Sequence, residues 1–288
     1  MDFRALAMGL AFSLMWSSAF ATARIIVADA PPLWALTLRF ALSGLIAVAV
    51  ARALGQSWHL SRPIAQSVII FGLCQNALYL GLNFIALQWV QASLASIIAS
   101  AMPLIVALLG WLWRGDKVGP LGQTGLALGF AGVALIMGTR LSGGTDPMGL
   151  ALCVIGATAL AVATLTVHSV SAGGNLLMVV GLQMWVGALI LAVAALLTEP
   201  FVVTLSTALI VAFFYQLLIP GLAATLLWFA LVKRVGAVRA SAYHFLNPFF
   251  GVAVAAALLG EHISLTDIIG VLIAMAGILA VQLSRRTL

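Results

Sequence analysis

The sequence predicts an all-α polytopic membrane protein with ten transmembrane helices, arranged as two inverted repeats of five helices each. Three observations support this fold class. The chain is only 7% charged and 64% hydrophobic, whereas soluble domains carry roughly 25% charged residues. No Asp, Glu, Lys or Arg occurs within residues 63–113, 147–198 or 200–232, and a membrane-spanning helix needs about 20 apolar residues. The third observation, an internal repeat, follows below.

Gly, Pro and polar clusters divide the apolar runs into ten predicted spans. They cover residues 5–23, 32–53, 63–87, 91–113, 118–138, 147–169, 175–198, 206–231, 236–259 and 265–284. The first run also resembles a secretory signal, with a charged start and a small-residue ending. Its length, about 19 residues, and the presence of Trp16 favour a transmembrane helix.

The distribution of Lys and Arg predicts the orientation. Loops that lie on the side of the N-terminus hold ten of the 13 basic residues: Arg4, Arg52, Arg62, Arg114, Lys117, Lys233, Arg234, Arg239, Arg285 and Arg286. The opposite loops hold only Arg24 and Arg140, and Arg39 lies inside a span. Because basic loops stay in the cytoplasm, both termini are predicted to be cytoplasmic.

A shift of 145 residues aligns the chain with itself over about 40 residues without a gap. The matched pairs include Val90 with Val235, Ala92 with Ala237, Ala95 with Ala240, Ser96 with Ser241, Pro103 with Pro248, Gly125 with Gly270 and Gly132 with Gly277. Each half holds five spans, and five is odd, so the second half enters the membrane from the opposite side. Inverted repeats of this kind are typical of secondary transporters that bind solute near the bilayer midplane.

Four segments carry a family resemblance: "WSSAF" in the first span, "PPLWALTLRF" opening the second, and the paired "SAMPLIVALLGWLWRGD" and "FLNPFFGVAVAAALLGE". With the two five-span halves, they resemble the EamA-type branch of the drug/metabolite transporter superfamily over essentially the whole chain. The resemblance implies one EamA-type repeat at residues 1–140 and a second, inverted repeat at 147–288. Within this family the chain is most similar to bacterial aromatic amino-acid exporters of the YddG type, by overall likeness rather than by any single motif.

The ninth span contains the first candidate site residues. "AYHFLNPFFG" places His244, Asn247 and Pro248 near the midplane, and the repeat partner Pro103 lies near the centre of the fourth span. A proline removes a helical hydrogen bond, so we expect two gating kinks at equivalent positions. His244 and Asn247 would be costly toward lipid and are expected to face the cavity. Titration of His244 during transport is a further alternative.

The third and fourth spans carry polar stripes at helical spacing. Asn76, Tyr79 and Asn83 share one predicted face of the third span and are candidates for the cavity wall. Ser93, Ser96 and Ser100 follow a similar spacing in the fourth span. Small serines often only allow close helix packing, so Ser100 is a candidate for either packing or the cavity.

Three further residues are candidates because of their depth. Trp16 and Trp185 lie near the centres of their spans, where a ring can stack on an aromatic solute or simply fill space. Trp228 and Trp89 lie nearer the membrane ends and are expected to anchor at the interface. Arg39 could bind a solute carboxylate or, as we favour at this point, the carbonyls of a helix end.

The absences in the sequence narrow the function. No span contains a clearly buried Asp or Glu, which cation pumps commonly use, and no ATP-binding loop of the GxxxxGK[ST] kind occurs. Scattered basic residues exclude a nucleic-acid surface, and no HExxH motif or paired Asp indicates an enzyme, a metal or a cofactor. Dimerisation is not indicated, so a monomer in contact with membrane lipid is compatible with the sequence. The sequence predicts a secondary transporter of the bacterial inner membrane that exports amino acids or related metabolites by alternating access. Neutral or zwitterionic amino acids are favoured, aromatic ones foremost; the alternative is a multidrug or cation exporter of the same superfamily.

Overall fold

The computed structural model describes residues 2–166, 175–236, 240 and 242–284, and these residues form helices without any strand. Six helices are continuous: α1 (Phe3–Asp29), α2 (Pro32–Ala53), α7 (Pro120–Ser142), α8 (Pro147–Thr166), α9 (Leu176–Thr198) and α14 (Leu265–Ser284). The other four spans are interrupted. They are α3–η1–α4 (Arg62–Phe71, Gly72–Leu80, Gly81–Ala86), α5–α6 (Ala92–Ser100, Met102–Arg114), α10–η2–α11 (Thr207–Leu218, Ile219–Ala223, Ala224–Val235) and η3–α13 (Ala242–Leu246, Asn247–Leu259).

Length and hydropathy identify these spans as membrane-crossing helices. Within the described residues, nine are long and apolar enough to span a bilayer, and Tyr243–Leu259 forms a shorter apolar helix. The prediction of an all-α polytopic membrane protein is therefore confirmed. The predicted first span ended too early, because α1 continues past residue 23 to Asp29. The arginine that suggested a loop, Arg24, stays helical and donates a hydrogen bond to the carbonyl oxygen of Leu87.

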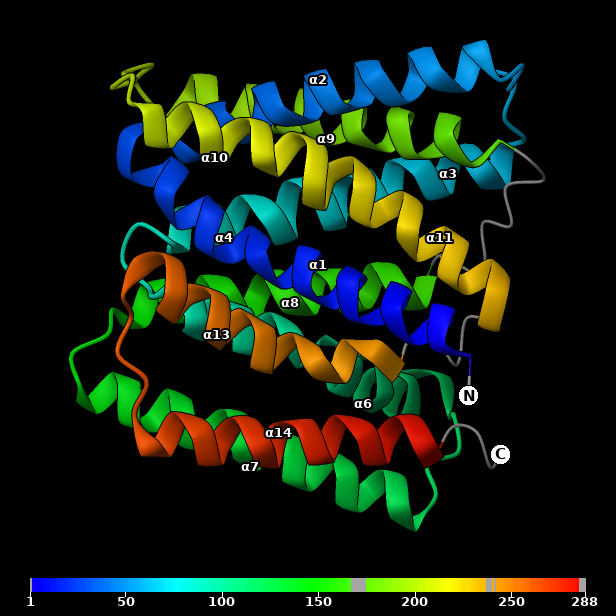
Figure 1. Cartoon of the computed structure of the whole chain (residues 1–288). Helices are drawn as coiled ribbons and strands as arrows, with labels where there is room; N and C mark the ends of the chain where they lie inside the picture. The colour runs from blue at the N-terminus through cyan, green and yellow to red at the C-terminus, as the bar shows by residue number, and fades with distance from the viewer. Residues whose placement is uncertain (1, 167–174, 237–239, 241, 285–288) are drawn as a thin grey trace.

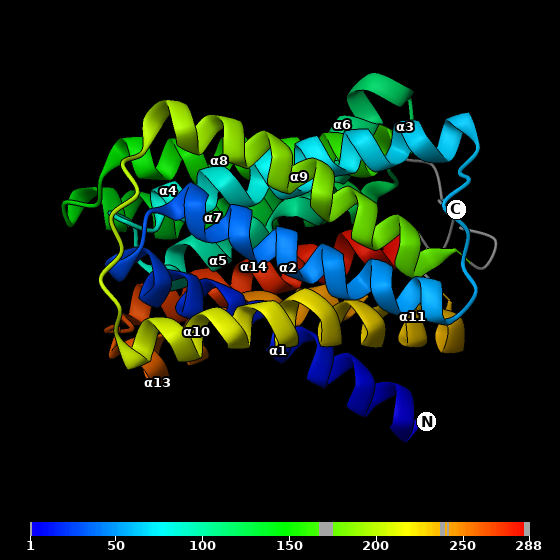
Figure 2. The same ribbon diagram turned by 90° about the horizontal axis from the view of Figure 1, so that it is seen from above.

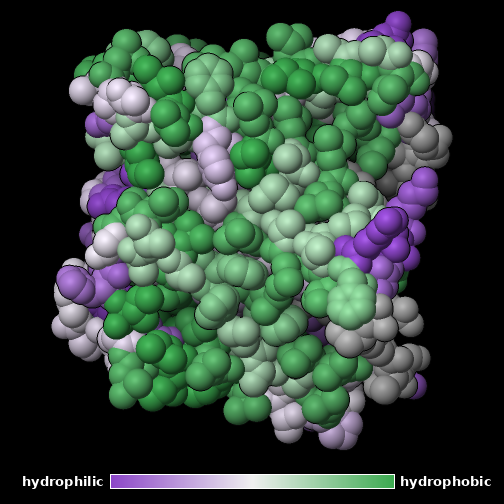
Figure 3. Space-filling model, in the orientation of Figure 1, coloured by the Kyte–Doolittle hydropathy of each residue, from purple (hydrophilic) through white to green (hydrophobic). Residues whose placement is uncertain are grey.

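The helices run side by side, and both chain ends lie at the same end of the bundle (Figures 1 and 2). We call this the termini end and the opposite one the far end. Hydrophobic side chains cover the middle of the visible face, and hydrophilic ones gather toward its two edges (Figure 3). This pattern is the one expected for an apolar belt in contact with lipid. Arg239, Arg285, Arg286, Ala237 and Ser241, used above for orientation and the repeat, lie outside the described residues.

Helices at equivalent positions of the two predicted halves pack against each other. Helix α2 lies along α9, and α7 lies along α14. In the second pair, glycines allow the backbones to meet: a Cβ added to Gly132 would lie 2.6 Å from the carbonyl oxygen of Gly270, and one added to Gly125 would lie 2.9 Å from that of Gly277. Exchange of the two halves converts one contact into the other, since Gly125 corresponds to Gly270 and Gly132 to Gly277 at the shift of 145 residues.

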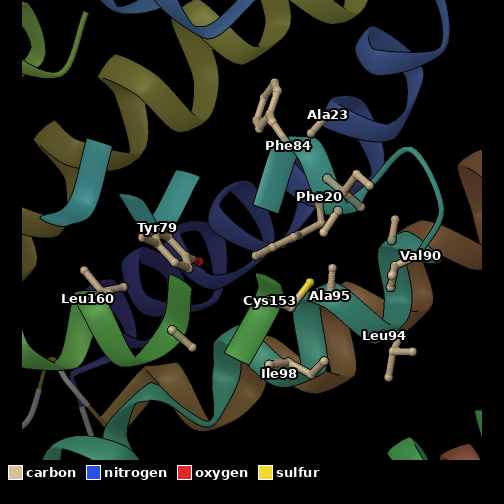
Figure 4. Packing of buried hydrophobic residues seen from close by; sticks show 14 of the residues in the cluster. Phe20, Ala23, Tyr79, Phe84, Val90, Leu94, Ala95, Ile98, Cys153 and Leu160 are labelled. Carbon is tan, nitrogen blue, oxygen red and sulfur yellow. The ribbon is translucent and has the colours of Figure 1, made fainter. Parts of the chain in front are cut away.

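The largest hydrophobic core gathers helices from both halves. It includes Phe20 of α1, Phe84 of α4, Leu94 of α5 and Cys153 of α8, all buried. Figure 4 shows these side chains on separate helices of the cluster, together with Tyr79. A bilayer supplies no hydrophobic force between helices, so this close packing and the interhelical polar contacts hold the bundle together.

Candidate functional site

A small cavity lies inside the bundle, among helices α1, α2, η1, α4, α10 and η2. Its volume is about 40 Å³, which has room for a few water molecules but no amino acid. The lining residues are Trp16, Ala19, Phe20, Ala23, Arg39, Gln75, Tyr79, Leu80, Asn83, Phe84, Leu87, Gln216 and Pro220. Figure 4 shows four of them, Phe20, Ala23, Tyr79 and Phe84, near one another.

Arg39 is a buried cation in this lining. Its side chain is 6% exposed, and no hydrogen bond or ion pair reaches it from the described residues; its closest described partner is the ring of Phe40, 5.1 Å from Cζ to the ring centre. The structural alternative required helix-end carbonyl oxygens to accept hydrogen bonds from Arg39. Among the described residues, none of them does. A buried charge without a partner is costly, so a complementary anionic group would be strongly favoured here.

Two buried amides also line the cavity. Asn83 is 1% exposed and donates from Nδ2 to the carbonyl oxygen of Tyr79 at 2.7 Å. Gln216 is fully buried and donates from Nε2 to the carbonyl oxygen of Ala19 and to Oγ1 of Thr22. The carbonyl oxygen of each amide, Asn83 Oδ1 and Gln216 Oε1, has no hydrogen-bond partner within the described part of the chain. Leaving such an acceptor unpaired costs about 1–3 kcal/mol.

The helices that carry these groups are distorted at equivalent places in the two halves. Residues Gly72–Leu80 and Ile219–Ala223 adopt the wider π-helical form. A shift of 145 residues places the second segment within the first. π-Helical turns often occur at functional sites, because they redirect side chains that a regular helix would spread around its surface. Here the segments present Gln75 and Tyr79 from one half and Pro220 from the other to the same cavity.

An aromatic cluster lies next to the cavity on the side of the termini end. Phe12, Trp16, Trp228 and His244 form it, with ring centres 4.8–6.5 Å apart. Trp16 belongs to both the cluster and the cavity. Trp228 was expected at the membrane interface, but its ring turns inward against Phe12 and His244. Asn247 donates from Nδ2 to Nδ1 of His244 at 3.0 Å, an arrangement that suits a neutral imidazole.

Both predicted kink prolines lie at helix breaks. Helix α5 ends at Ser100 and α6 begins at Met102, so Pro103 falls in the first turn of α6. Likewise the 3₁₀ segment Ala242–Leu246 ends where α13 begins, and Pro248 falls in its first turn. A proline is tolerated there because first-turn nitrogens have no helical acceptor. Ser13 and Ser17 of α1 donate to the carbonyl oxygens of Tyr243 and Asn247 around the second break.

Five other candidates lie outside the cavity lining: Asn76, Ser100, Trp185, His244 and Asn247. Asn76 faces α9 and donates to the carbonyl oxygen of Gln183 at 2.9 Å. Ser100 donates to the carbonyl oxygen of Ser96 in its own helix. Trp185 packs against α2 and donates from Nε1 to the carbonyl oxygen of Ala41. His244, although not in the lining, contacts it through the ring of Trp16.

At the far end, carboxylates join the two predicted halves. Glu261, in the loop after α13, accepts from the backbone nitrogens of Ala92 and Ser93 at the start of α5. Glu199, after α9, accepts from the nitrogens of Leu33 and Trp34 at the start of α2. Each carboxylate satisfies helix-start nitrogens and the positive end of the helix dipole. These contacts hold the starts of α2 and α5 to the segments that follow α9 and α13.

The principal residue that sequence reasoning missed is Gln216. It is the polar centre of "FFYQLLIPG" in an uncharged run, one turn before Pro220. That pattern matches the reasoning applied to Asn247 and Pro248, so the signal was present. Gln75 was missed next to Asn76, and the π-helical turn explains why neighbouring polar residues reach different surroundings.

A polytopic helical bundle with a small internal cavity that contains buried polar side chains is an architecture expected of a membrane carrier. Comparison with known proteins gives the family. A model of the EamA-like transporter family matches the chain twice, over residues 3–138 and 147–283. The chain therefore belongs to the EamA-like transporter family, and it is a membrane transporter rather than an enzyme.

Named relatives are also transporters. The chain is 28% identical to the uncharacterized transporter YvbV of Bacillus subtilis, over 93% of this chain and 88% of that protein. It is 26% identical to the uncharacterized inner membrane transporter YedA of Escherichia coli K12, over 88% and 82% of the two chains. A crystal structure that is 21% identical matches 100% of this chain and 99% of its own with a TM-score of 0.67, which shows a shared fold.

Proposed function

We propose that this transporter exports neutral, zwitterionic amino acids, aromatic ones foremost, or closely related metabolites. One observation carries the proposal: the cavity contains a buried, unpartnered cation, Arg39, and no acidic side chain among its described lining residues. An α-carboxylate supplies the missing anionic partner for a guanidinium. A solute with net positive charge would be repelled from the same position.

Aromatic solutes are favoured by the walls around the charge. Trp16, Phe20, Tyr79 and Phe84 contribute rings to a lining that is otherwise mostly aliphatic. Aromatic rings in offset or edge contact gain about 0.5–1.5 kcal/mol beyond burial. This is the feature by which the chain would resemble exporters of the YddG type.

Transport would proceed by alternating access without ATP. We propose residues 1–140 and 147–288 as the two inverted repeats, with the helix breaks before Pro103 and Pro248 as the bends. The carboxylate contacts at the far end would open as the aromatic cluster at the termini end closes. In the other half of the cycle, these contacts would form again as the cluster opens. Only one side of a site near the midplane is open at a time in such a cycle.

The termini end is proposed to face the cytoplasm of a bacterial inner membrane. Among the described basic residues, Arg4, Arg52, Arg62, Lys117, Lys233 and Arg234 lie at or beyond helix ends on that side. Arg24 and Arg140 lie toward the far end. The asymmetry follows the positive-inside rule, and export then runs from the termini end to the far end.

Efflux from proteoliposomes tests the proposal. Vesicles that contain the purified transporter are loaded in parallel with labelled phenylalanine, threonine or tetraphenylphosphonium, without ATP or an imposed ion gradient. We expect phenylalanine to leave faster than from protein-free vesicles and faster than threonine. Transport of tetraphenylphosphonium alone would refute the proposal and support the multidrug or cation exporter instead.

A further inference from the structure

The unpartnered groups of the cavity are of two opposite kinds. Arg39 offers hydrogen-bond donors and a positive charge, whereas Asn83 Oδ1 and Gln216 Oε1 offer only acceptors. All three side chains are more than nine-tenths buried and line the same small volume, although they come from α2, α4 and α10. Groups of both kinds are therefore available to one bound molecule.

The hydrogen-bond network fixes which way each amide points. Gln216 Nε2 is engaged with the Ala19 carbonyl oxygen and with Thr22 Oγ1, and that hydroxyl itself donates to the Ser18 carbonyl oxygen. Asn83 Nδ2 is engaged with the Tyr79 carbonyl oxygen. Rotation of either amide would bring its oxygen against another acceptor. The free atom of each amide is therefore its oxygen, which has partial negative charge.

A close approach of α2 and η2 brings the guanidinium of Arg39 to the turn that follows Gln216. A Cβ added to Gly221 would be 3.0 Å from the backbone carbonyl oxygen of Gln216, 3.5 Å from Ser43 Oγ and 3.8 Å from Arg39 Nη2. The guanidinium of α2 thus lies against the turn of α10 and η2 that carries Gln216. An α-amino acid has its ammonium and its carboxylate on one carbon atom, so the two ends need opposite partners at this short range.

We propose that the cavity recognises a zwitterion through divided roles: Arg39 binds the carboxylate, and the amide oxygens of Gln216 and Asn83 accept hydrogen bonds from the ammonium group. This inference rests on the proposed function and adds the residues that bind the ammonium group of the solute. Neutral acceptors suit a zwitterion better than a carboxylate would. An Asp or Glu at either position would pair with Arg39 and block the anion site.

The side chain of the solute would then lie against the rings of the lining. Trp16 and Phe20 of α1 and Phe84 of α4 contribute them. The present volume of about 40 Å³ requires these rings to move apart on binding. Binding of water alone is the competing account of the free oxygens, since a polar cavity of this size holds water. If the amide oxygens bind the ammonium group, replacing the amides changes which ligand is preferred. If they bind only water, the preference stays the same.

Calorimetric titration of the transporter in nanodiscs distinguishes binding of the ammonium group from binding of water. The probes are L-phenylalanine, 3-phenylpropionate, which lacks the ammonium group, and 2-phenylethylamine, which lacks the carboxylate. Wild-type protein should bind phenylalanine most tightly. Gln216→Met and Asn83→Leu should each weaken phenylalanine binding about tenfold and leave 3-phenylpropionate binding unchanged. Arg39→Gln should weaken both carboxylates and leave 2-phenylethylamine unchanged or tighter.

Matched controls test for general damage. Gln183→Met on α9 and Asn76→Leu on η1 remove an amide at sites outside the cavity lining, and both should retain the wild-type order of the three probes. Size-exclusion chromatography and thermal unfolding confirm that each variant is folded. Because Gln216 and Asn83 lie on different helices, a folding defect in one of the two amide variants still leaves the other variant to test the ammonium site.

The outcomes separate this inference from the proposed function. If Gln216→Met and Asn83→Leu weaken phenylalanine and 3-phenylpropionate equally, or weaken neither, the assignment of the ammonium site is wrong while amino-acid transport stands. If wild-type protein binds 2-phenylethylamine but neither phenylalanine nor 3-phenylpropionate, both proposals are overturned. The inference is supported if Gln216→Met and Asn83→Leu lose the preference for phenylalanine over 3-phenylpropionate and the control variants keep it.

Discussion

The carboxylate of Glu261 lies 2.7 Å from the backbone nitrogen of Ala92, across the boundary between the two predicted halves. A second carboxylate oxygen accepts from Ser93 at 3.1 Å. The contact fixes the start of the broken span α5–α6 to the loop that follows α13. Any opening of the far end that separates these segments has to break it.

Glu261→Gln should weaken this far-end closure. The variant keeps one acceptor but loses the charge that interacts with the dipole of α5, at a cost of about 1 kcal/mol. In a background with Cys74 and Cys153 replaced by alanine, a cysteine at Leu87, in the cavity lining, should react faster with a polar thiol reagent. Asp146→Asn is the matched control, since the described hydrogen bond of the Asp146 carboxylate is to the backbone nitrogen of Gly149, in the first turn of its own helix α8. Equal labelling rates in both variants would contradict a latch role.

Glu199 should make stability depend on pH. Partial burial raises the pKa of this carboxyl group, against a smaller lowering by the nitrogens of Leu33 and Trp34. A carboxyl group with a raised pKa in the folded state favours folding when it is protonated, and this contribution is lost as the pH rises through the folded pKa. Wild-type protein should therefore gain thermal stability relative to Glu199→Gln as the pH falls from 7 toward 4. A constant difference between the two unfolding temperatures would exclude this linkage.

Gly132→Val should destabilise the bundle by several kcal/mol or prevent folding. A Cβ at this position would lie 2.6 Å from backbone atoms of Gly270 and Ala274, and backbone cannot move aside as a side chain can. Gly138→Val on the same helix is the control, because no atom lies within 4 Å of its added Cβ. Thermal unfolding in detergent measures the difference. Comparable stability of the two variants would mean that α7 and α14 do not cross so closely.

Pro248→Ala should slow transport while the protein remains folded. Alanine restores a hydrogen-bond donor and allows α13 to extend back through the 3₁₀ segment Ala242–Leu246, which stiffens the bend. Phenylalanine efflux from proteoliposomes should fall severalfold. The control Pro120→Ala changes a proline in the first turn of the continuous helix α7 and should transport normally. Unchanged efflux for Pro248→Ala would remove the gating role of this break.

Trp16→Leu should reduce the preference for aromatic solutes. The ring lines the cavity and meets Phe12 and His244, so its loss removes aromatic contacts worth about 0.5–1.5 kcal/mol. The ratio of phenylalanine to threonine efflux should fall by about two- to tenfold. Trp185→Leu, which removes a ring that packs between α9 and α2, should preserve this ratio. If Trp185→Leu lowers the ratio of phenylalanine to threonine efflux and Trp16→Leu does not, the aromatic site lies near Trp185 and not near Trp16.

The sequence by itself determined the fold class and the approximate limits of the spans, although four of the described spans are interrupted. The predicted spans 32–53 and 265–284 agree with α2 and α14 to the residue. Such accuracy is possible because a bilayer imposes both an apolar composition and a minimum length on each crossing. The early end predicted for α1 arose from Arg24, whose hydrogen bond to a loop carbonyl lets the helix continue.

The membership of the site was decided only by tertiary structure. Trp16, Arg39, Tyr79 and Asn83 were candidates from the sequence and line the cavity, whereas Asn76 faces α9. Regular helical geometry placed Asn76 and Asn83 on one face, but the π-helical segment between Gly72 and Leu80 rotates them apart. Hydropathy reports how deep a residue lies in the membrane. Which neighbour it meets depends on how each helix is turned against the others, and packing across the two halves sets that rotation.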